Sequence, residues 1–165
     1  MTRVTGSRLE ILLSDRIWSR IGCEQDGYIT VDSIGVPMGG AGLSASLRDL
    51  CRFGELMRCE GAWHGQQIIP AEVVADTRRG ADPRKFAMAE YTLLPGYSYR
   101  NMWWVAHNPL GLFEGRGIHG QRLYIVPQAE LVIARFASHP IASSAANDPI
   151  TLPAFAALSH LLMKG

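Results

Sequence analysis

The sequence lacks several features that mark specialised classes of protein. Its three cysteines are odd in number and form no Cys-x-x-Cys pair, which argues against a disulfide framework and against a zinc site. No stretch approaches 18 uncharged apolar residues, and the first ten residues hold no apolar signal core. The 16 basic and 15 acidic residues nearly cancel and form no basic run, which argues against a dedicated nucleic-acid surface. These absences predict a soluble protein in a reducing, cytoplasmic setting, with no cofactor or metal indicated.

The residues that are present predict one globular domain with a substantial core. The chain has 165 residues, of which 47% are hydrophobic and 19% charged. Ser7 and Glu10 have the spacing of a capping box, and Asp49 is expected in a first helical turn, where the helix dipole favours an acid. The predicted helices run from Leu9 to Ile21, from Leu47 to about Cys59, from Pro70 over a short length, and from Asp148 onwards.

The strands are predicted mainly in the C-terminal half. Residues 115–136 indicate a hairpin whose two strands are apolar on both faces, as in central strands covered on two sides, with a turn at Pro127 and Gln128. Further strands are predicted for Tyr99–Val105, for Leu112–Glu114 and, in the N-terminal part, for Tyr28–Val31, whereas residues 80–96 indicate mostly loop. Helices followed by closely spaced strands and a closing helix predict an α+β fold: an antiparallel meander covered by helices.

The glycine-rich approach to this hairpin is the first candidate for a site. Gly115, Gly117 and Gly120 flank His119 and let the backbone pass close to another group. Such a turn commonly presents backbone N–H groups to a ligand, although nothing in the rest of the chain supplies the nucleophile that it would serve.

Three blocks resemble a known family. GGAGLSASLRDLCRFGELM (residues 39–57), GQQIIP (65–70) and GRGIHGQRLYIVPQAELVIARF (115–136) resemble, in this order, parts of the serine hydrolases of the class C β-lactamase and penicillin-binding-protein type. The run from Asp26 to Gly54 is especially similar to the 6-aminohexanoate-dimer hydrolase branch, an amidase relative of the β-lactamases. The resemblance extends over nearly the whole chain but implies only the C-terminal part of that family's domain, with residues 1–165 as one such portion.

The resemblance implies an acyl-transfer machine with three elements: a Ser-x-x-Lys motif, a Tyr-x-Asn or Tyr-x-Ser motif, and a strand with a backbone oxyanion donor. None of the eleven serines is followed by lysine three residues later. The one Tyr-x-Asn, at residues 99–101, follows the predicted helix 47–59 instead of preceding it, so we interpret it as coincidental. Since the first helix also begins close to Met1, we expect a truncated domain without its N-terminal catalytic half.

The third element is the one that this sequence retains. The resemblance implies Ile118 N–H as the oxyanion donor and His119 as a cleft side chain, with Gly117, Gly120, Gln121 and Trp103 as substrate-binding residues. The segment has no lysine, which departs from the Lys-Thr-Gly pattern.

Simpler interpretations stay open for several of these residues. His119 is equally well a core imidazole with one satisfied nitrogen. Since adjacent strand residues face opposite ways, one of Trp103 and Trp104 is expected in the core and the other in a cleft or on the surface. Residues 97, 99 and 100 are expected at the surface, and the remaining histidines share no metal-ligand spacing.

Two functional hypotheses follow. The first is a fragment of a serine amidase or esterase that is inactive alone, acts on a small amide or ester only with its missing half, and associates with that half or with itself. The second is a non-catalytic module that binds a ligand or partner. Neither involves nucleic acid or membrane.

Overall fold

A five-stranded antiparallel sheet forms the centre of the C-terminal half of the protein. The structure is a computed structural model that describes residues 2–89 and 93–164. Each strand pairs with the next one along the chain, in the order β5-β6-β7-β8-β9, so the predicted α+β meander is confirmed. The strands are β5 (Ser98–Arg100), β6 (Trp103–Val105), β7 (Phe113–Arg116), β8 (Arg122–Val126) and β9 (Leu131–Arg135).

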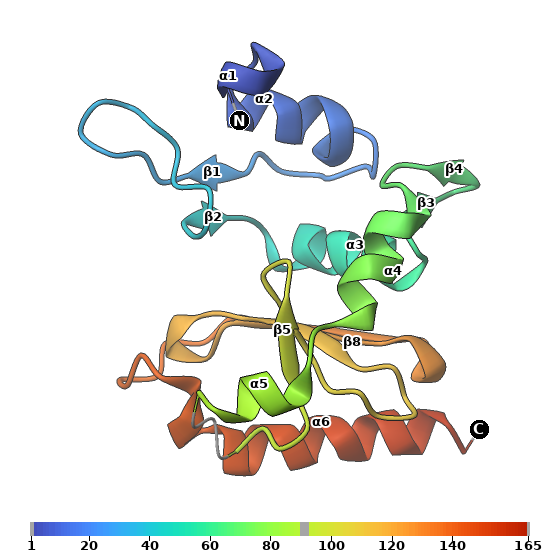
Figure 1. Ribbon diagram of the computed structural model, residues 1–165. Helices are drawn as coiled ribbons and strands as arrows, with labels where there is room; N and C mark the ends of the chain where they lie inside the picture. Colours follow the sequence, from blue (N-terminus) through green and yellow to red (C-terminus); the bar gives the residue numbers. More distant parts are fainter. Residues whose placement is uncertain (1, 90–92, 165) are drawn as a thin grey trace.

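One long helix covers each face of this sheet (Figure 1). Helix α3 (Leu47–Arg58) packs on one face and α6 (Asp148–Leu162) on the other. Leu123 and Ile125 of β8 belong to the core cluster that includes Met57 of α3, while Tyr124 and Val126 belong to a second cluster against which Phe155 of α6 packs. The period-two alternation of β8 therefore feeds two cores, which is why its sequence is apolar at every position after Arg122.

The two strands of the predicted hairpin differ in position. Every residue of β8 is buried, as predicted for a central strand, whereas every residue of β9 is only partly buried. Among the described residues, no strand pairs with the outer edge of β9. The prediction that both strands are central is therefore wrong for β9. Apolar residues on both faces of a strand indicate that helices cover both faces of the sheet, but they do not indicate that a second strand pairs with it.

The predicted strand from Tyr99 to Val105 is two strands. Asn101 and Met102 have φ of 50° and 69°, so the chain reverses there and β5 pairs with β6 as a hairpin. Neither residue is a glycine, and the apolar run gave no signal for this turn. Tyr97, expected at the surface, is buried in the second core cluster.

The residues before α3 form an arm that lies apart from the sheet in Figure 1. The single helix predicted from Leu9 is α2 (Leu9–Leu13) followed by a π-helical turn, η1 (Ser14–Trp18), and it is preceded by α1 (Thr2–Thr5). The capping box is also wrong: Arg8 is the N-cap residue, and Ser7 N–H donates to Thr5 Oγ1. Two short paired strands, β1 (Tyr28–Ile29) and β2 (Leu43–Ser44), complete the arm.

The remaining short elements lie in the segments between α3 and α6. The described part of residues 80–96 holds one short helix inside the predicted loop, capped by Asp82, whose carboxylate accepts from Arg84 N–H. The short elements between α3 and α6, apart from the strands of the sheet, are β3 (Ala62–Trp63), β4 (Gln66–Gln67), α4 (Ala71–Arg79), α5 (Pro83–Ala87), η2 (Ile118–Gly120), η3 (Pro127–Ala129) and η4 (Ser144–Ala146).

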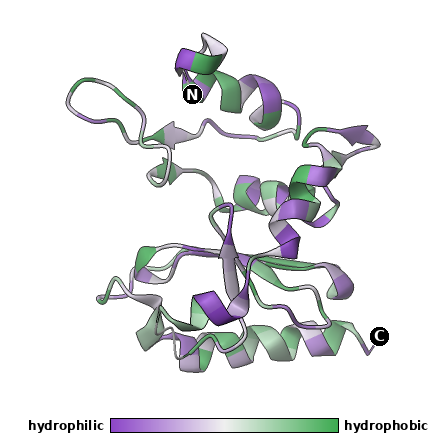
Figure 2. Ribbon diagram, viewed as in Figure 1, coloured by the Kyte–Doolittle hydropathy of each residue, from purple (hydrophilic) through white to green (hydrophobic). Residues whose placement is uncertain are grey.

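Helix α6 is hydrophobic along most of its length (Figure 2), and its outward-facing residues Ile150, Leu158 and Leu161 are exposed. Within the described part of the chain, no helix is both long and apolar enough to cross a membrane.

Candidate functional site

The candidate site begins where β7 ends. After Arg116 the chain passes through Gly117 into the 3-10 turn η2 and returns as β8, with Gly117 N–H donating to Gln121 O at 2.9 Å. A Cβ on Gly117 would lie 2.8 Å from the Cβ of Gln121, so only glycine lets the two arms of this turn close without a shift. The predicted glycine requirement therefore has a steric cause at this position.

Ile118 is the residue that this turn presents outward. Its side chain is 66% exposed, which is unusual for an isoleucine next to a buried strand. The flanking N–H groups are occupied, that of Gly117 by Gln121 O and that of His119 by Ala142 O at 2.9 Å. Among the described residues, Ile118 N–H donates to no acceptor. The N–H of the predicted donor thus has no acceptor within the described part of the chain, while the N–H groups on both sides of it are occupied.

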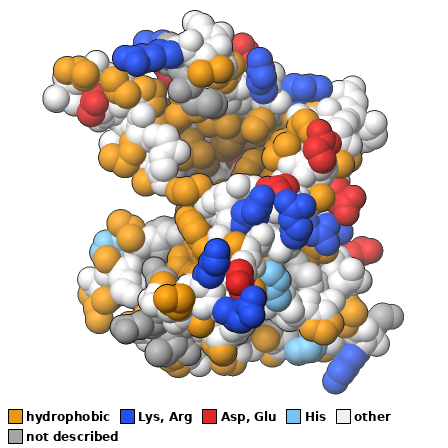
Figure 3. Space-filling view, in the orientation of Figure 1, with side chains coloured by type: hydrophobic (Ala, Val, Ile, Leu, Met, Phe, Trp, Pro, Cys, Tyr) orange, Lys and Arg blue, Asp and Glu red, His pale blue; other side chains and the backbone are white. Residues whose placement is uncertain are grey.

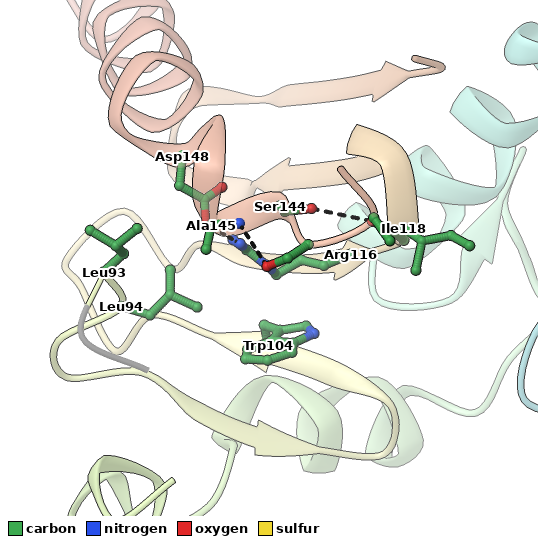
Figure 4. A pocket seen from close by; sticks show the side chains of 11 residues that line it. Leu93, Leu94, Trp104, Arg116, Ile118, Ser144, Ala145 and Asp148 are labelled. Atoms are coloured by element: carbon green, nitrogen blue, oxygen red, sulfur yellow. Dashed lines mark hydrogen bonds and ion pairs between the residues drawn. The ribbon is translucent and has the colours of Figure 1, made fainter. Parts of the chain in front are cut away.

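A pocket of about 360 Å³ opens beside this turn (Figure 4). Figure 4 shows Ile118 at one end of the pocket, Leu93 and Leu94 at the other, and the indole of Trp104 between them along one side, while Gly117 also lines the pocket. The remaining wall comes from the segment before α6, residues 142–145, together with Asp148. Apolar walls around a few polar groups are typical of small-molecule sites.

The polar end of the pocket is held by charged pairs. The Arg116 guanidinium donates to Glu114 Oε1 at 2.9 Å and to Asp148 Oδ2, and it lies over the Trp104 ring at 5.4 Å from the centroid. Burial alone would lower the pKa of Arg116, but the carboxylates of Glu114 and Asp148 outweigh it and raise that pKa. Arg116 therefore remains a cation whose position is fixed on three sides. Ser144 Oγ ties the opposite wall to the turn by donating to Gly117 O at 3.2 Å.

Three of the predicted site residues support the turn and do not line the pocket. His119 is partly buried, with Nδ1 2.7 Å from His139 O, so the alternative of an imidazole with one satisfied nitrogen describes it better than a cleft side chain. Gly120 is buried, and a Cβ there would meet the His139 ring at 2.3 Å. The Gln121 side chain bonds the backbone of Ala137 through both amide atoms, which leaves it no role toward a ligand in this arrangement.

The two adjacent tryptophans point to opposite faces of the sheet, as strand alternation predicts, but Trp104 and not Trp103 lines the pocket. Trp103 lies 5.2 Å from Phe113 and 6.4 Å from Phe53, between ring centroids, in the core beneath α3. Trp104 points to the opposite face and lines the pocket. Trp103 therefore does not line this pocket, and its predicted contact with substrate stays a prediction.

Sequence reasoning missed the pocket residues that come from distant segments. Arg116 lies inside the glycine-rich run, but the sequence does not show its ion pair with Asp148, which is 32 residues away. Asp148 was interpreted only as a helix start, and an acid at such a position usually needs no further partner.

One hydroxyl–imidazole pair exists elsewhere in the fold. Ser98 Oγ lies 2.7 Å from His107 Nε2, and Ala81 N–H donates to the same hydroxyl at 2.9 Å. Ser98 is completely buried, so no substrate carbonyl can reach it, and the pair is structural. The Tyr-x-Asn at residues 99–101 lies in the β5–β6 hairpin, where Asn101 Nδ2 donates to Asp76. Among the described residues, no group of three or more His, Cys, Asp or Glu side chains is placed to hold a metal ion.

Comparison with known proteins agrees with this architecture. No protein-family model matches the chain. The chain is 33% identical over 139 residues to 6-aminohexanoate-dimer hydrolase from Paenarthrobacter ureafaciens, a match that covers 84% of this chain and 36% of that protein.

Solved structures give the same answer. A Bacillus anthracis protein assigned as a 6-aminohexanoate-dimer hydrolase superposes with a TM-score of 0.83 at 34% identity, covering 97% of this chain and 40% of that one. EstCE1, a hydrolase with promiscuous acyltransferase activity, shares the fold at a TM-score of 0.65 and 15% identity, covering 99% of this chain and 52% of its own. The resemblance predicted from the sequence is confirmed: the chain is a relative of the 6-aminohexanoate-dimer hydrolases, with the β-lactamase-like hydrolase fold, and spans less than half of their length.

Proposed function

We propose that this chain is the C-terminal portion of a serine hydrolase domain of the amidase or esterase type, and that it supplies the oxyanion donor and one wall of the acyl-transfer pocket. The observation that carries the proposal is the Ile118 N–H, which is available beside a largely apolar pocket while both neighbouring N–H groups are occupied. A backbone donor of this kind stabilises the charge that develops on a carbonyl oxygen during acyl transfer.

The nucleophile belongs to another part of the domain. No serine of this chain stands three residues before a lysine, and the buried Ser98–His107 pair is closed to substrate. The proposed substrate is a small-molecule amide or ester whose apolar part lies against Trp104, Leu93 and Leu94. Without the nucleophile the chain has no chemical step to accelerate, so we expect it to be inactive alone.

The partner that completes the site is the remainder of the same kind of domain. The arm leaves large apolar side chains exposed, and Figure 3 shows a hollow between the arm and the rest of the molecule with hydrophobic side chains along it. Exposed patches of this kind mark contact surfaces. A cytoplasmic setting without nucleic acid or membrane fits the near-neutral charge and belongs to the same proposal.

Reconstitution tests the proposal. The chain is assayed against nitrophenyl esters and a linear amide, first alone and then with the complementary segment of the Paenarthrobacter hydrolase supplied as a second polypeptide. We expect no saturable turnover by the chain alone and measurable turnover by the pair. Saturable turnover by the chain alone would overturn the proposed division of labour.

The donor itself is tested by Ile118→Pro, which removes the N–H. Gly117 has φ −103° and ψ 169°, an extended conformation that a residue before proline can hold, and among the described residues Ile118 N–H has no acceptor whose hydrogen bond the change would break. Loss of one oxyanion donor is expected to lower the kcat of the reconstituted pair by about 100-fold or more. Ile118→Ala, which keeps the N–H, is the control and should retain most of kcat.

The alternative is a non-catalytic module that binds a ligand in this pocket. The observation that favours it is that the described residues already form a pocket of about 360 Å³ with an apolar part and a charged part. It would be supported if Trp104 fluorescence responded to an amide or ester in the chain alone while reconstitution gave no turnover.

A further inference from the structure

Three arginines stand in a row across the sheet, behind the candidate site. Arg116 pairs with Arg122 in the β7–β8 register, and Arg122 pairs with Arg135 in the β8–β9 register. Residues directly opposite in antiparallel strands point to the same face, so these three cations lie side by side on the α6 face of the sheet. Like charges in this relation destabilise a sheet unless other charges compensate them.

The compensation is complete for two of the three. Glu114 and Asp148 each bridge Arg116 and Arg122, with Arg122 donating at 2.9 Å to Glu114 Oε2 and at 2.7 Å to Asp148 Oδ1. Two carboxylates thus meet two guanidinium groups in a closed ring, and all four side chains are nearly inaccessible to solvent.

Arg135 has no carboxylate partner among the described residues. It donates to Gly120 O and to Thr151 Oγ1, both at 2.9 Å, and its guanidinium lies over the Phe155 ring at 5.6 Å from the centroid. Both acceptors are neutral, so the cluster of three arginines and two carboxylates carries one uncompensated positive charge. Burial lowers the pKa of Arg135, and repulsion from Arg122 lowers it further.

Arg122 and Arg135 each have one buried donor without an acceptor among the described residues. Within the described part of the chain, Arg122 Nε and Arg135 Nη2 are both buried and form no hydrogen bond. Arg122 is 1% exposed, so bulk water does not reach that group freely. Buried donors are nearly always paired, and an unpaired N–H on a cation is the most costly kind.

An anion would compensate the excess positive charge and would also accept hydrogen bonds from the two unsatisfied donors. We propose that the Arg122–Arg135 end of the row binds one small monovalent anion, either chloride or the carboxylate of a small acid. One negative charge brings the cluster to neutrality, and a halide or carboxylate accepts N–H groups from two sides. Arg135 is only partly buried, so the anion reaches the pair from the Arg135 side. This site is independent of the proposed hydrolase function.

The test compares anions at equal ionic strength. The Tm of the full chain is measured in 100 mM sodium chloride, sodium formate and sodium methanesulfonate, the last being a larger and weakly coordinating anion. For a millimolar Kd we expect a Tm higher by about 5 °C in chloride or formate than in methanesulfonate. A rise with chloride alone identifies a halide site, and a larger rise with formate identifies a carboxylate site.

Two variants separate this site from general salt effects. Arg135→Gln removes the excess charge and should abolish the dependence on the anion, and in methanesulfonate its Tm should equal or exceed that of the parent chain because the repulsion is relieved. Arg48→Gln makes the same change of charge on an exposed residue outside the cluster and should keep the full dependence.

A binding measurement on the unmodified chain tests the proposal even if a variant folds poorly. Chlorine-35 line broadening by the unmodified chain should saturate with chloride and be reversed by formate if the two compete. Equal Tm values in all three salts, together with no saturable broadening, would overturn the proposal and leave a buried water as the partner of both donors.

Discussion

The arm and the sheet body both contain many apolar residues but bury them to very different extents. In β8 all five residues are buried, whereas among residues 3–46 only Ile21 is. The arm nevertheless exposes many large apolar side chains, among them Val4, Tyr28, Ile34, Val36 and Met38. Apolar content therefore does not by itself make a core, because burial needs a second layer on the other side.

One buried acid helps to attach the arm to the body. Asp49 of α3 is completely buried and accepts the N–H groups of Glu24 and Gln25 at 2.9 and 3.1 Å, together with Ser46 Oγ and Arg52. Burial acts to raise the pKa of Asp49, but these hydrogen bonds outweigh it and hold the pKa below its usual value. Hydrogen bonds to a buried carboxylate thus hold the arm against α3, whereas apolar packing holds the sheet.

The largest effect is expected where the body buries charge. Glu114→Ala removes one of the two carboxylates of the closed ring and leaves Arg116 and Arg122 sharing the other. Breaking a buried pair in this way should lower the free energy of unfolding by about 4 kcal/mol. Urea denaturation measures it, and Glu55→Ala, which breaks the partly exposed pair with Arg58, is the control and should cost less than about 1 kcal/mol. Equal costs would show that the ring does not stabilise the body.

A matched pair of isoleucines tests the comparison directly. Ile125 in β8 is completely buried, while Ile34 in the arm is 83% exposed. Ile125→Ala should lower the free energy of unfolding by about 3 kcal/mol, because it removes buried methyl groups and leaves a cavity. Ile34→Ala should change it by less than about 0.5 kcal/mol. A large loss at Ile34 would mean that the arm has a covered face in solution, most simply through self-association, which sedimentation would detect.

The sequence predicted the parts of the fold that local patterns determine. The strand at residues 122–126, the capped helix at 47–58 and the Asp148 helix start all follow from periodicity and capping within a few residues of the chain. Asp49 shows the limit of this reasoning. Its place in a first helical turn was predicted, but its burial depends on two backbone N–H groups 24 and 25 residues away.

The same limit applies to the candidate site. The Gly117–Ile118 turn was predicted, because glycine spacing and resemblance both lie within one segment. Trp104 and Trp103 were interchangeable in the sequence, since alternation says that they point to opposite faces but not which face holds the pocket. Arg116 and Asp148 were missed because ion pairs across 32 residues leave no local pattern.

The anchor of the arm should be specific to the arm. Asp49→Asn keeps the shape of the side chain but removes the charge that four donors share, and it should cost about 2 kcal/mol. Hydrogen exchange should speed up most at the amides of Glu24 and Gln25, while those of β8 stay protected. Uniform loss of protection across the sheet would instead show that the arm and the body unfold as one unit.

A second acid anchor, inside the body and closer to solvent, sharpens the contrast with Asp49. Asp76 of α4 accepts from Arg100 Nε and Nη2 at 2.8 and 2.7 Å and from Asn101 Nδ2 at 2.9 Å, which joins the helix to the β5–β6 hairpin. These bonds, first from Arg100 and then from Asn101, lower the pKa of Asp76 to about 2.

Because the folded-state pKa of Asp76 is depressed, its stabilisation is present above the unfolded value, about 4, and is lost as the pH falls toward 2. Urea midpoints measured across this range should therefore fall with pH in the parent chain and fall less in Asp76→Asn. The Asp76 side chain is 30% exposed, so its share should be the smallest of the four effects and should shrink at high salt. Asp49→Asn should flatten the same profile more strongly and with less dependence on salt, because Asp49 is fully buried. If Asp76→Asn proved the flatter of the two, exposure would not be what separates a strong anchor from a weak one in this fold.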